Sequence, residues 1–123
     1  MARVDFLAIR AELKTDEDGN ATFITRPFKG DWLDRVDIFL SDLPEGASLS
    51  IVEDTTNLSV LELNEIKVGR YPVRLETCNA VGERLAGVYY VYATNDKLRV
   101  TIANGGAENT LSMNLYVSTE HPG

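Results

Sequence analysis

The chain has 123 residues, 44% of them hydrophobic and 25% charged, which suits one domain with a core that needs no disulfide or metal. Its net charge of −7 argues against a nucleic-acid partner, because binding phosphates requires a basic surface. The acidic excess falls mainly in the first half of the chain, where it either steers a basic partner or keeps the protein soluble.

No apolar stretch approaches the roughly 20 residues that span a bilayer, and the first residues lack the apolar run of a signal peptide. We therefore expect a protein that is made in a cytoplasm and has no membrane partner.

The first predicted element is a strand over residues 3–14, apolar on both faces when it is read with a period of two. Such a strand lies between two layers or against another subunit. Apolar residues at spacings of three and four keep a helix open as an alternative. The polar run 16–20 predicts a hairpin loop, and residues 21–28 predict the returning strand, which Pro27 ends.

The middle of the chain continues as short strands separated by turns rich in Gly, Pro, Asn and Asp. Pro72 suits an edge strand, since it cannot donate to a sheet ladder. A turn is expected at 79–83, around Gly82. In chain order, these strands are predicted at residues 32–40, 48–52, 58–63, 71–75 and 85–94.

The last quarter of the chain shows the cleanest alternation. Residues 98–103 and 111–118 each carry one apolar and one polar face, separated by the turn 104–109, which predicts an antiparallel hairpin. We expect an opposing sheet to cover the apolar face. The residues predicted to be buried there are Val100, Ile102, Met113 and Leu115.

These eight or nine short strands, with no convincing helix, predict an all-β fold and a single domain over residues 1–123. An antiparallel β-sandwich is our prediction, and a closed barrel is the alternative.

Asp16, Asp18 and Asn20 alternate as calcium ligands do. Gly19 comes too early for an EF-hand loop, however, and Pro27 stands where a bidentate glutamate is needed. A solvated loop is the prediction, and no metal or cofactor is expected.

The residues that carry nucleophilic and acid–base chemistry are sparse. His121, the only histidine, lies near the end of the sequence, and Cys78, the only cysteine, has no basic cluster nearby to lower its pKa. Without a second cysteine no internal disulfide is expected. We predict that the protein has no catalytic residue and is not an enzyme.

Aromatic residues offer one candidate binding surface. Trp32, Tyr71, Tyr89 and Tyr116 could form the platform of a carbohydrate-binding module, but such residues also fill β-sheet cores and interfaces.

The order of several short phrases is more suggestive than any one motif. Over roughly residues 33–118 the chain resembles small β-sandwich head decoration (cement) proteins of tailed bacteriophages. The resemblance implies a jelly-roll-like sandwich that forms a dimer or trimer and staples the major capsid protein from the capsid surface of the virion, after synthesis in the host cytoplasm. The phrases that carry it are residues 36–47, 49–54, 71–74, the Gly82 turn, 89–92 and 97–106.

Under this hypothesis the termini, residues 1–6 and 118–123, reach neighbouring subunits. A carbohydrate-binding module, or another phage component of the tail or connector, remains the alternative. The interface candidates are Met1, Arg3, Val4, Phe6, Trp32, Tyr71 and Tyr116.

Overall fold

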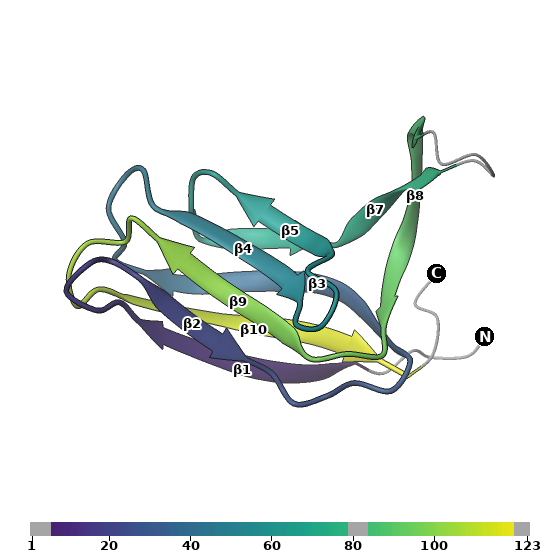
Figure 1. Cartoon of the computed structure of the whole chain (residues 1–123), viewed down its shortest axis with the longest axis horizontal. Helices are drawn as coiled ribbons and strands as arrows, with labels where there is room; N and C mark the ends of the chain where they lie inside the picture. The colour runs from purple at the N-terminus through teal and green to yellow at the C-terminus, as the bar shows by residue number, and fades with distance from the viewer. Residues whose placement is uncertain (1–5, 79–83, 120–123) are drawn as a thin grey trace.

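A computed structural model describes residues 6–78 and 84–119, with the side chains of 76–91 not described. All of the described secondary structure is β-strand, in two antiparallel sheets that stack as a sandwich, which confirms the predicted fold class (Figure 1). The strands are β1 Leu7–Lys14, β2 Ala21–Ile24, β3 Asp31–Ser41, β4 Ser48–Glu53, β5 Ser59–Leu63, β6 Gly69–Pro72, β7 Arg74–Cys78, β8 Arg84–Thr94, β9 Leu98–Ala103 and β10 Thr110–Ser118.

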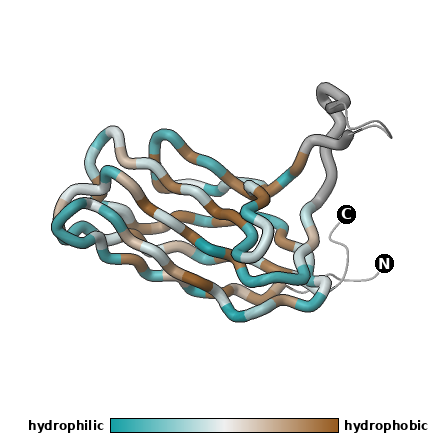
Figure 2. Tube along the Cα trace, in the orientation of Figure 1, coloured by the Kyte–Doolittle hydropathy of each residue, from teal (hydrophilic) through white to brown (hydrophobic). Residues whose placement is uncertain are grey.

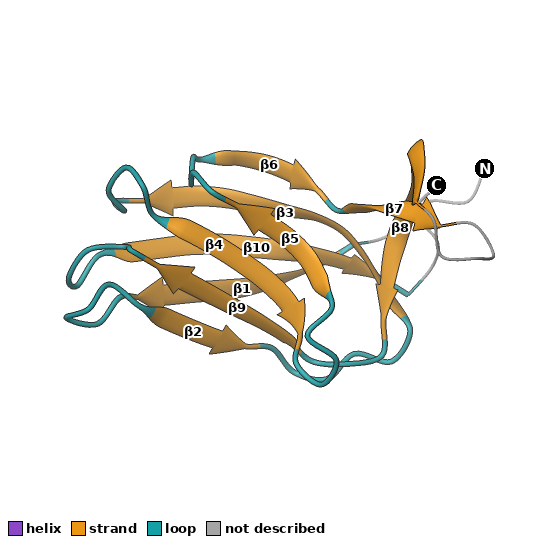
Figure 3. Cartoon of the chain, turned by 45° about the horizontal axis from the view of Figure 1, so that its top comes forward, coloured by secondary structure: helices purple, strands orange, loops and turns teal. Residues whose placement is uncertain are grey.

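The two sheets differ in size. The six-stranded sheet has the order β1-β10-β3-β8-β7, with β6 also paired to β3, and the four-stranded sheet has the order β2-β9-β4-β5 (Figure 3). The consecutive pairs β1 and β2, β3 and β4, and β9 and β10 each divide between the sheets, so the chain crosses repeatedly from one layer to the other.

The core lies between the sheets and follows the period-two pattern of the strands, which is visible as alternating colour in Figure 2. The four predicted core residues Val100, Ile102, Met113 and Leu115 are all 0% exposed, so that prediction is confirmed. They pack with apolar residues from both layers, including Ala11, Leu13, Phe28, Leu33, Val36, Ile38, Leu49, Ile51, Leu98 and Leu111.

The predicted hairpin between 98–103 and 111–118 is wrong. β9 pairs with β2 and β4, whereas β10 pairs with β1 and β3 in the other sheet. Connection 104–109 is long enough to bridge the ~10 Å between stacked sheets, so the two apolar faces meet across the core. The hairpin expected around 16–20 is wrong for the same reason, since β1 and β2 pair with different neighbours.

The β1–β2 and β9–β10 connections, which we call the crossing loops, are hydrogen-bonded to each other at one end of the sandwich. Gly105 N–H donates to the Gly19 carbonyl at 2.9 Å, and Thr15 N–H donates to the Asn109 carbonyl at 2.8 Å. The Thr15 hydroxyl donates to the Gly106 carbonyl at 2.5 Å and accepts from Asn109 N–H at 2.9 Å. Gly19 has a φ of +83°, and a Cβ there would lie 2.9 Å from Gly106 N, so glycine is required at this contact.

The described chain has ten strands, where eight or nine were expected. The segment predicted at 71–75 is interrupted at buried Val73, so β6 pairs with β3 and β7 pairs with β8. The strand predicted at 21–28 ends at Ile24, and residues 7–14 form a strand and not a helix. Residues 3–5 and the turn at 79–83 lie outside the described residues.

Strands β7 and β8 leave the sandwich together. Only Tyr92–Thr94 of β8 pairs with β3, whereas the earlier part of β8 pairs with β7, from Arg74↔Val91 to Cys78↔Arg84. We call residues 74–78 and 84–91 the arm. Figure 1 shows the arm extending away from both sheets, at the end where β1 begins and β10 ends.

Candidate functional site

Arginine and aromatic side chains cover the outer face of the six-stranded sheet. The guanidinium carbon of Arg35 lies 4.0 Å from the ring centroid of Tyr116 and 5.8 Å from that of Phe6. The guanidinium carbon of Arg10 lies 4.5 Å from the ring centroid of Phe39. These are cation–π distances, worth about 0.5–1 kcal/mol each at exposed sites. We call these five residues the arginine–aromatic face.

Two irregularities in the pairing of β3 with β10 shape this face. Leu33 pairs with Val117 and Arg35 with Tyr116, which leaves Asp34 as the extra residue of a bulge. A second shift leaves Phe39 without a partner on β10. Bulges redirect side chains, and here they place a carboxylate beside Arg35 and leave Phe39 42% exposed.

Two carboxylates lie among three arginines next to this face. Asp34 Oδ1 lies 2.9 Å from Arg74 Nη2, and Asp34 Oδ2 lies 3.4 Å from Arg35 Nη1. Asp37 Oδ1 lies 3.3 Å from Arg35 Nε, and Asp37 Oδ2 lies 3.7 Å from Arg70 Nε. The two carboxylates therefore offset two of the three arginine charges, and Arg35 lies between Asp34 and Asp37. Arg35 Nε and Asp37 Oδ1 form an ion pair but no hydrogen bond.

The structure brings together two of the predicted interface residues. Phe6 and Tyr116 both lie beside Arg35. Trp32 is half-buried on β3 and pairs in register with Ser118. Tyr71 lies elsewhere: its ring packs against the core and its hydroxyl donates to the Lys67 carbonyl at 2.5 Å. Met1, Arg3 and Val4 lie outside the described residues, as do the termini beyond Phe6 and Thr119.

The aromatic residues considered for sugar binding do not form one platform among the described side chains. Arg35 stacks on the ring of Tyr116, and the ring of Tyr71 faces the core. The side chain of Tyr89 is among those not described. Nothing here favours a carbohydrate site over an interface.

The loop that resembles a calcium site is closed by its own main chain. Asp16 Oδ1 accepts N–H groups from Asp18 and Asn20, each at 2.9 Å, which is the pattern of a turn. Among the described side chains, those of residues 6–75 and 92–119, no cluster of three or more potential metal-ligating groups occurs. His121 and the side chain of Cys78 are not among the described groups.

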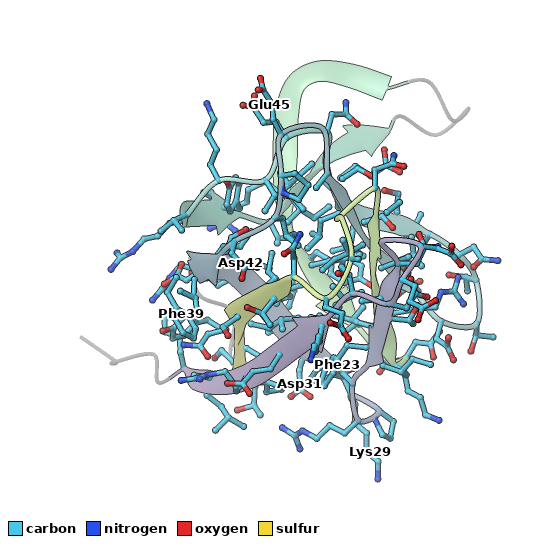
Figure 4. All side chains as sticks on the ribbon, turned by 90° about the vertical axis from the view of Figure 1, so that its left-hand side faces the viewer. Phe23, Lys29, Asp31, Phe39, Asp42 and Glu45 are labelled. Carbon is cyan, nitrogen blue, oxygen red and sulfur yellow. The ribbon has the colours of Figure 1, made fainter. Side chains whose placement is uncertain are left out.

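This loop belongs to an acidic end of the sandwich, opposite the arm. The neighbouring loops meet there, since Thr110 N–H donates to Asp42 Oδ1 at 2.5 Å and a Cβ on Gly106 would lie 3.4 Å from Pro44 Cγ. Figure 4 looks onto this end, with Asp42 and Glu45 labelled. Its exposed carboxylates are those of Asp16, Glu17, Asp18, Asp42, Glu45 and Glu108.

A hollow of about 430 Å³ lies between the β4–β5 and β8–β9 turns. The Tyr92 hydroxyl donates to Glu53 Oε2, and burial, followed by this bond, raises the pKa of Tyr92 above its usual range. The Thr55 N–H, 2.8 Å from Asp96 Oδ2, lowers the pKa of the Asp96 carboxyl. Thr94 Oγ1 also lies 3.3 Å from Glu53 Oε2. Each of these polar groups bonds to a neighbour within the hollow. The bonds link the β4–β5 turn to the β8–β9 turn, and they do not form an acid–base pair.

The arm is a feature that the sequence prediction missed. Residues 85–92 contain no charged side chain, and this composition gave the prediction of a strand but no sign that it leaves the sandwich. The available signal was the lack of a polar face, which is unusual for a strand at the surface of a sheet.

The chain is thus an all-β protein whose described residues form a two-sheet sandwich with a projecting arm. Comparisons with protein-family models, with curated proteins and with solved structures found no match. In the part of the chain that is described, no helix is long and apolar enough to cross a membrane.

Proposed function

We propose that this protein is a non-enzymatic virion structural protein, a decoration protein that binds the outside of a bacteriophage shell. Its partners in this role are the major capsid protein and further copies of itself. The observation that carries the proposal is the arm, which extends from a rigid sandwich and has the composition of an interface.

A two-stranded ribbon is at best marginally stable in water by itself. The ladder that joins β8 to β3 is limited to Tyr92–Thr94, and Arg74 at the base of the arm pairs with Asp34. Beyond this base, residues 85–91 carry no charged side chain. A second protein packed against such a ribbon would support both strands and place their uncharged residues between the two proteins. A shell subunit adjacent to the one that holds the sandwich would provide this cover.

The sandwich supplies the fixed body that such a contact needs. Its strand order, β1-β10-β3-β8 facing β2-β9-β4-β5, fits a jelly-roll with β6 and β7 inserted, in agreement with the family resemblance. Two of the three arginine charges next to the arginine–aromatic face are offset by carboxylates, so this face suits contact with protein better than contact with phosphate. Several copies on one shell would strengthen each weak contact through effective concentration.

The test is retention on purified expanded shells. Full-length protein is mixed with shells that lack it, the shells are heated or washed, and the bound fraction is measured by sedimentation. We expect full-length protein to be retained. A shortened variant, with residues 77–88 replaced by a two-residue Asn-Gly turn, should be lost on washing, because a type I′ turn closes the ribbon between Glu76 and Tyr89 and removes the outer part of the arm.

A matched control keeps the arm and removes residues 1–4, the other proposed reaching segment. If only the variant with the shortened arm is lost from the shells, the arm makes the contact with the shell. If only the variant without residues 1–4 is lost, those residues make it instead. A full-length protein that never associates with shells, or that binds tails instead, contradicts the decoration role.

A further inference from the structure

Strand β1 is an open edge of the six-stranded sheet. Among the described strands it pairs with β10 alone, over the full length from Leu7↔Val117 to Lys14↔Thr110. Leu7 is 54% exposed, and the side chains of Arg10 and Glu12 are 55% and 64% exposed. An exposed edge of this length is a template for pairing with another strand.

The neighbouring hydrogen bonds fix the direction in which the main-chain groups of β1 point. Thr15 N–H donates toward Asn109, and Asp42 N–H donates to the Thr110 carbonyl from the opposite side of β10. In an antiparallel ladder, bonding direction alternates residue by residue. The N–H and C=O groups of Ala8, Arg10, Glu12 and Lys14 therefore point away from β10, toward the open edge.

We propose that a second copy of this chain pairs with β1 in antiparallel orientation, with Ala11 of each copy meeting on the twofold axis. This register sets Arg10 opposite Glu12 of the second copy, and Glu12 opposite its Arg10. Ala8 then faces Lys14, and Ile9 faces Leu13 on the core side. All four outward-pointing residues of each strand fall on bonded positions of the new ladder.

Charge complementarity selects this partner and this register. Moving the strands by two residues in one direction sets Arg10 opposite Arg10, and moving them in the other direction sets Glu12 opposite Glu12. Like charges directly opposite destabilise an antiparallel pair. In the monomer, Arg10 Nη1 lies 2.9 Å from Glu12 Oε1 of the same strand, so both groups are already side by side and exchange partners on pairing.

The interface is isologous, because each copy offers the same strand to the other, and it closes at two copies. It joins the two six-stranded sheets into one continuous sheet through the dimer. This inference does not rest on the proposed function, since it concerns the purified protein alone.

Sedimentation equilibrium over a range of concentrations tests the proposal with four proteins. The wild type is expected to dimerise reversibly. Arg10→Glu opposes Glu12 with a like charge twice per dimer and should raise Kd at least about tenfold. Arg10→Glu/Glu12→Arg restores opposite charges and should restore the dimer. Arg70→Glu, the matched control on exposed β6, should leave Kd unchanged.

Cross-linking checks the register. In a Cys78→Ser background, Ala11→Cys should form a disulfide-linked dimer, because position 11 faces itself across the axis. Ala8→Cys should not form one, although Ala8 is exposed and Ala11 is buried. A wild type that stays monomeric, a trimer, a double variant that fails to recover, or cross-linking through position 8 alone overturns the proposal.

Discussion

The crossing loops at the acidic end predict that Gly105→Ala destabilises the protein by about 2–3 kcal/mol. A Cβ at position 105 would lie 2.7 Å from Thr15 Cγ2 and 3.0 Å from Ile102 Cγ2. Thr15 cannot rotate freely, because its hydroxyl bonds to both Gly106 and Asn109. Inserting one carbon into a packed site costs about 1–3 kcal/mol, and losing a hydrogen bond adds about 0.5–1.5 kcal/mol.

Urea denaturation measures this loss as a shift of the unfolding midpoint, about 1 M for a slope near 2 kcal/mol/M. Thr15→Ser provides the decisive second variant, because it removes Cγ2 and keeps the hydroxyl. In a Gly105→Ala background it should recover part of the lost stability, the remainder reflecting the contact with Ile102. Gly69→Ala is the control, since nothing lies within 4 Å of its added Cβ. An unchanged midpoint in Gly105→Ala, or no recovery with Thr15→Ser, would refute the interlocked geometry.

Two further predictions concern buried side chains. Leu115→Ala should lower the free energy of unfolding by about 2–5 kcal/mol, because Leu115 is 0% exposed between the sheets, and a loss within error in denaturation would contradict that packing. The pKa of Tyr92 is raised in the folded protein, so above pH ~10 its phenol stays protonated in the native state and ionises in the unfolded state. The free energy of unfolding therefore falls as the pH rises above this value. Tyr92→Phe should therefore lose less stability than the wild type between about pH 9 and 11. Equal slopes of stability against pH would contradict the raised pKa that burial and the bond to Glu53 produce.

Which side chains of a strand face the core could be predicted from the sequence, because this depends only on the alternation within that strand. In β9 and β10, side chains alternate with a period of two whatever the strands pair with, so Val100 and Leu115 were placed correctly in the core. The pairing itself is not local. A hairpin and a crossing between sheets satisfy the same alternation, and only a two-residue turn would have required a hairpin. Connection 104–109 is compatible with both.

The arginine–aromatic face could be predicted only in part, because its residues come together through strand pairing, which is not local. Phe6 and Tyr116 were singled out as large aromatic residues, but Arg35, which lies between them, was not. Its position depends on the bulge at Asp34, and a bulge shifts register in a way that the alternation of one strand does not reveal.

The distribution of charge favours self-association away from the acidic end. Two copies that met through the loops around Asp18 and Glu45 would oppose exposed carboxylates, and like charges in contact resist association. Strand β1 instead carries opposite charges at Arg10 and Glu12, and residues 85–91 of the arm carry none. If copies join through β1 and the arm covers a neighbour, the acidic loops remain exposed to solvent. A basic partner would then encounter this end first, at a rate that falls as salt screens the attraction.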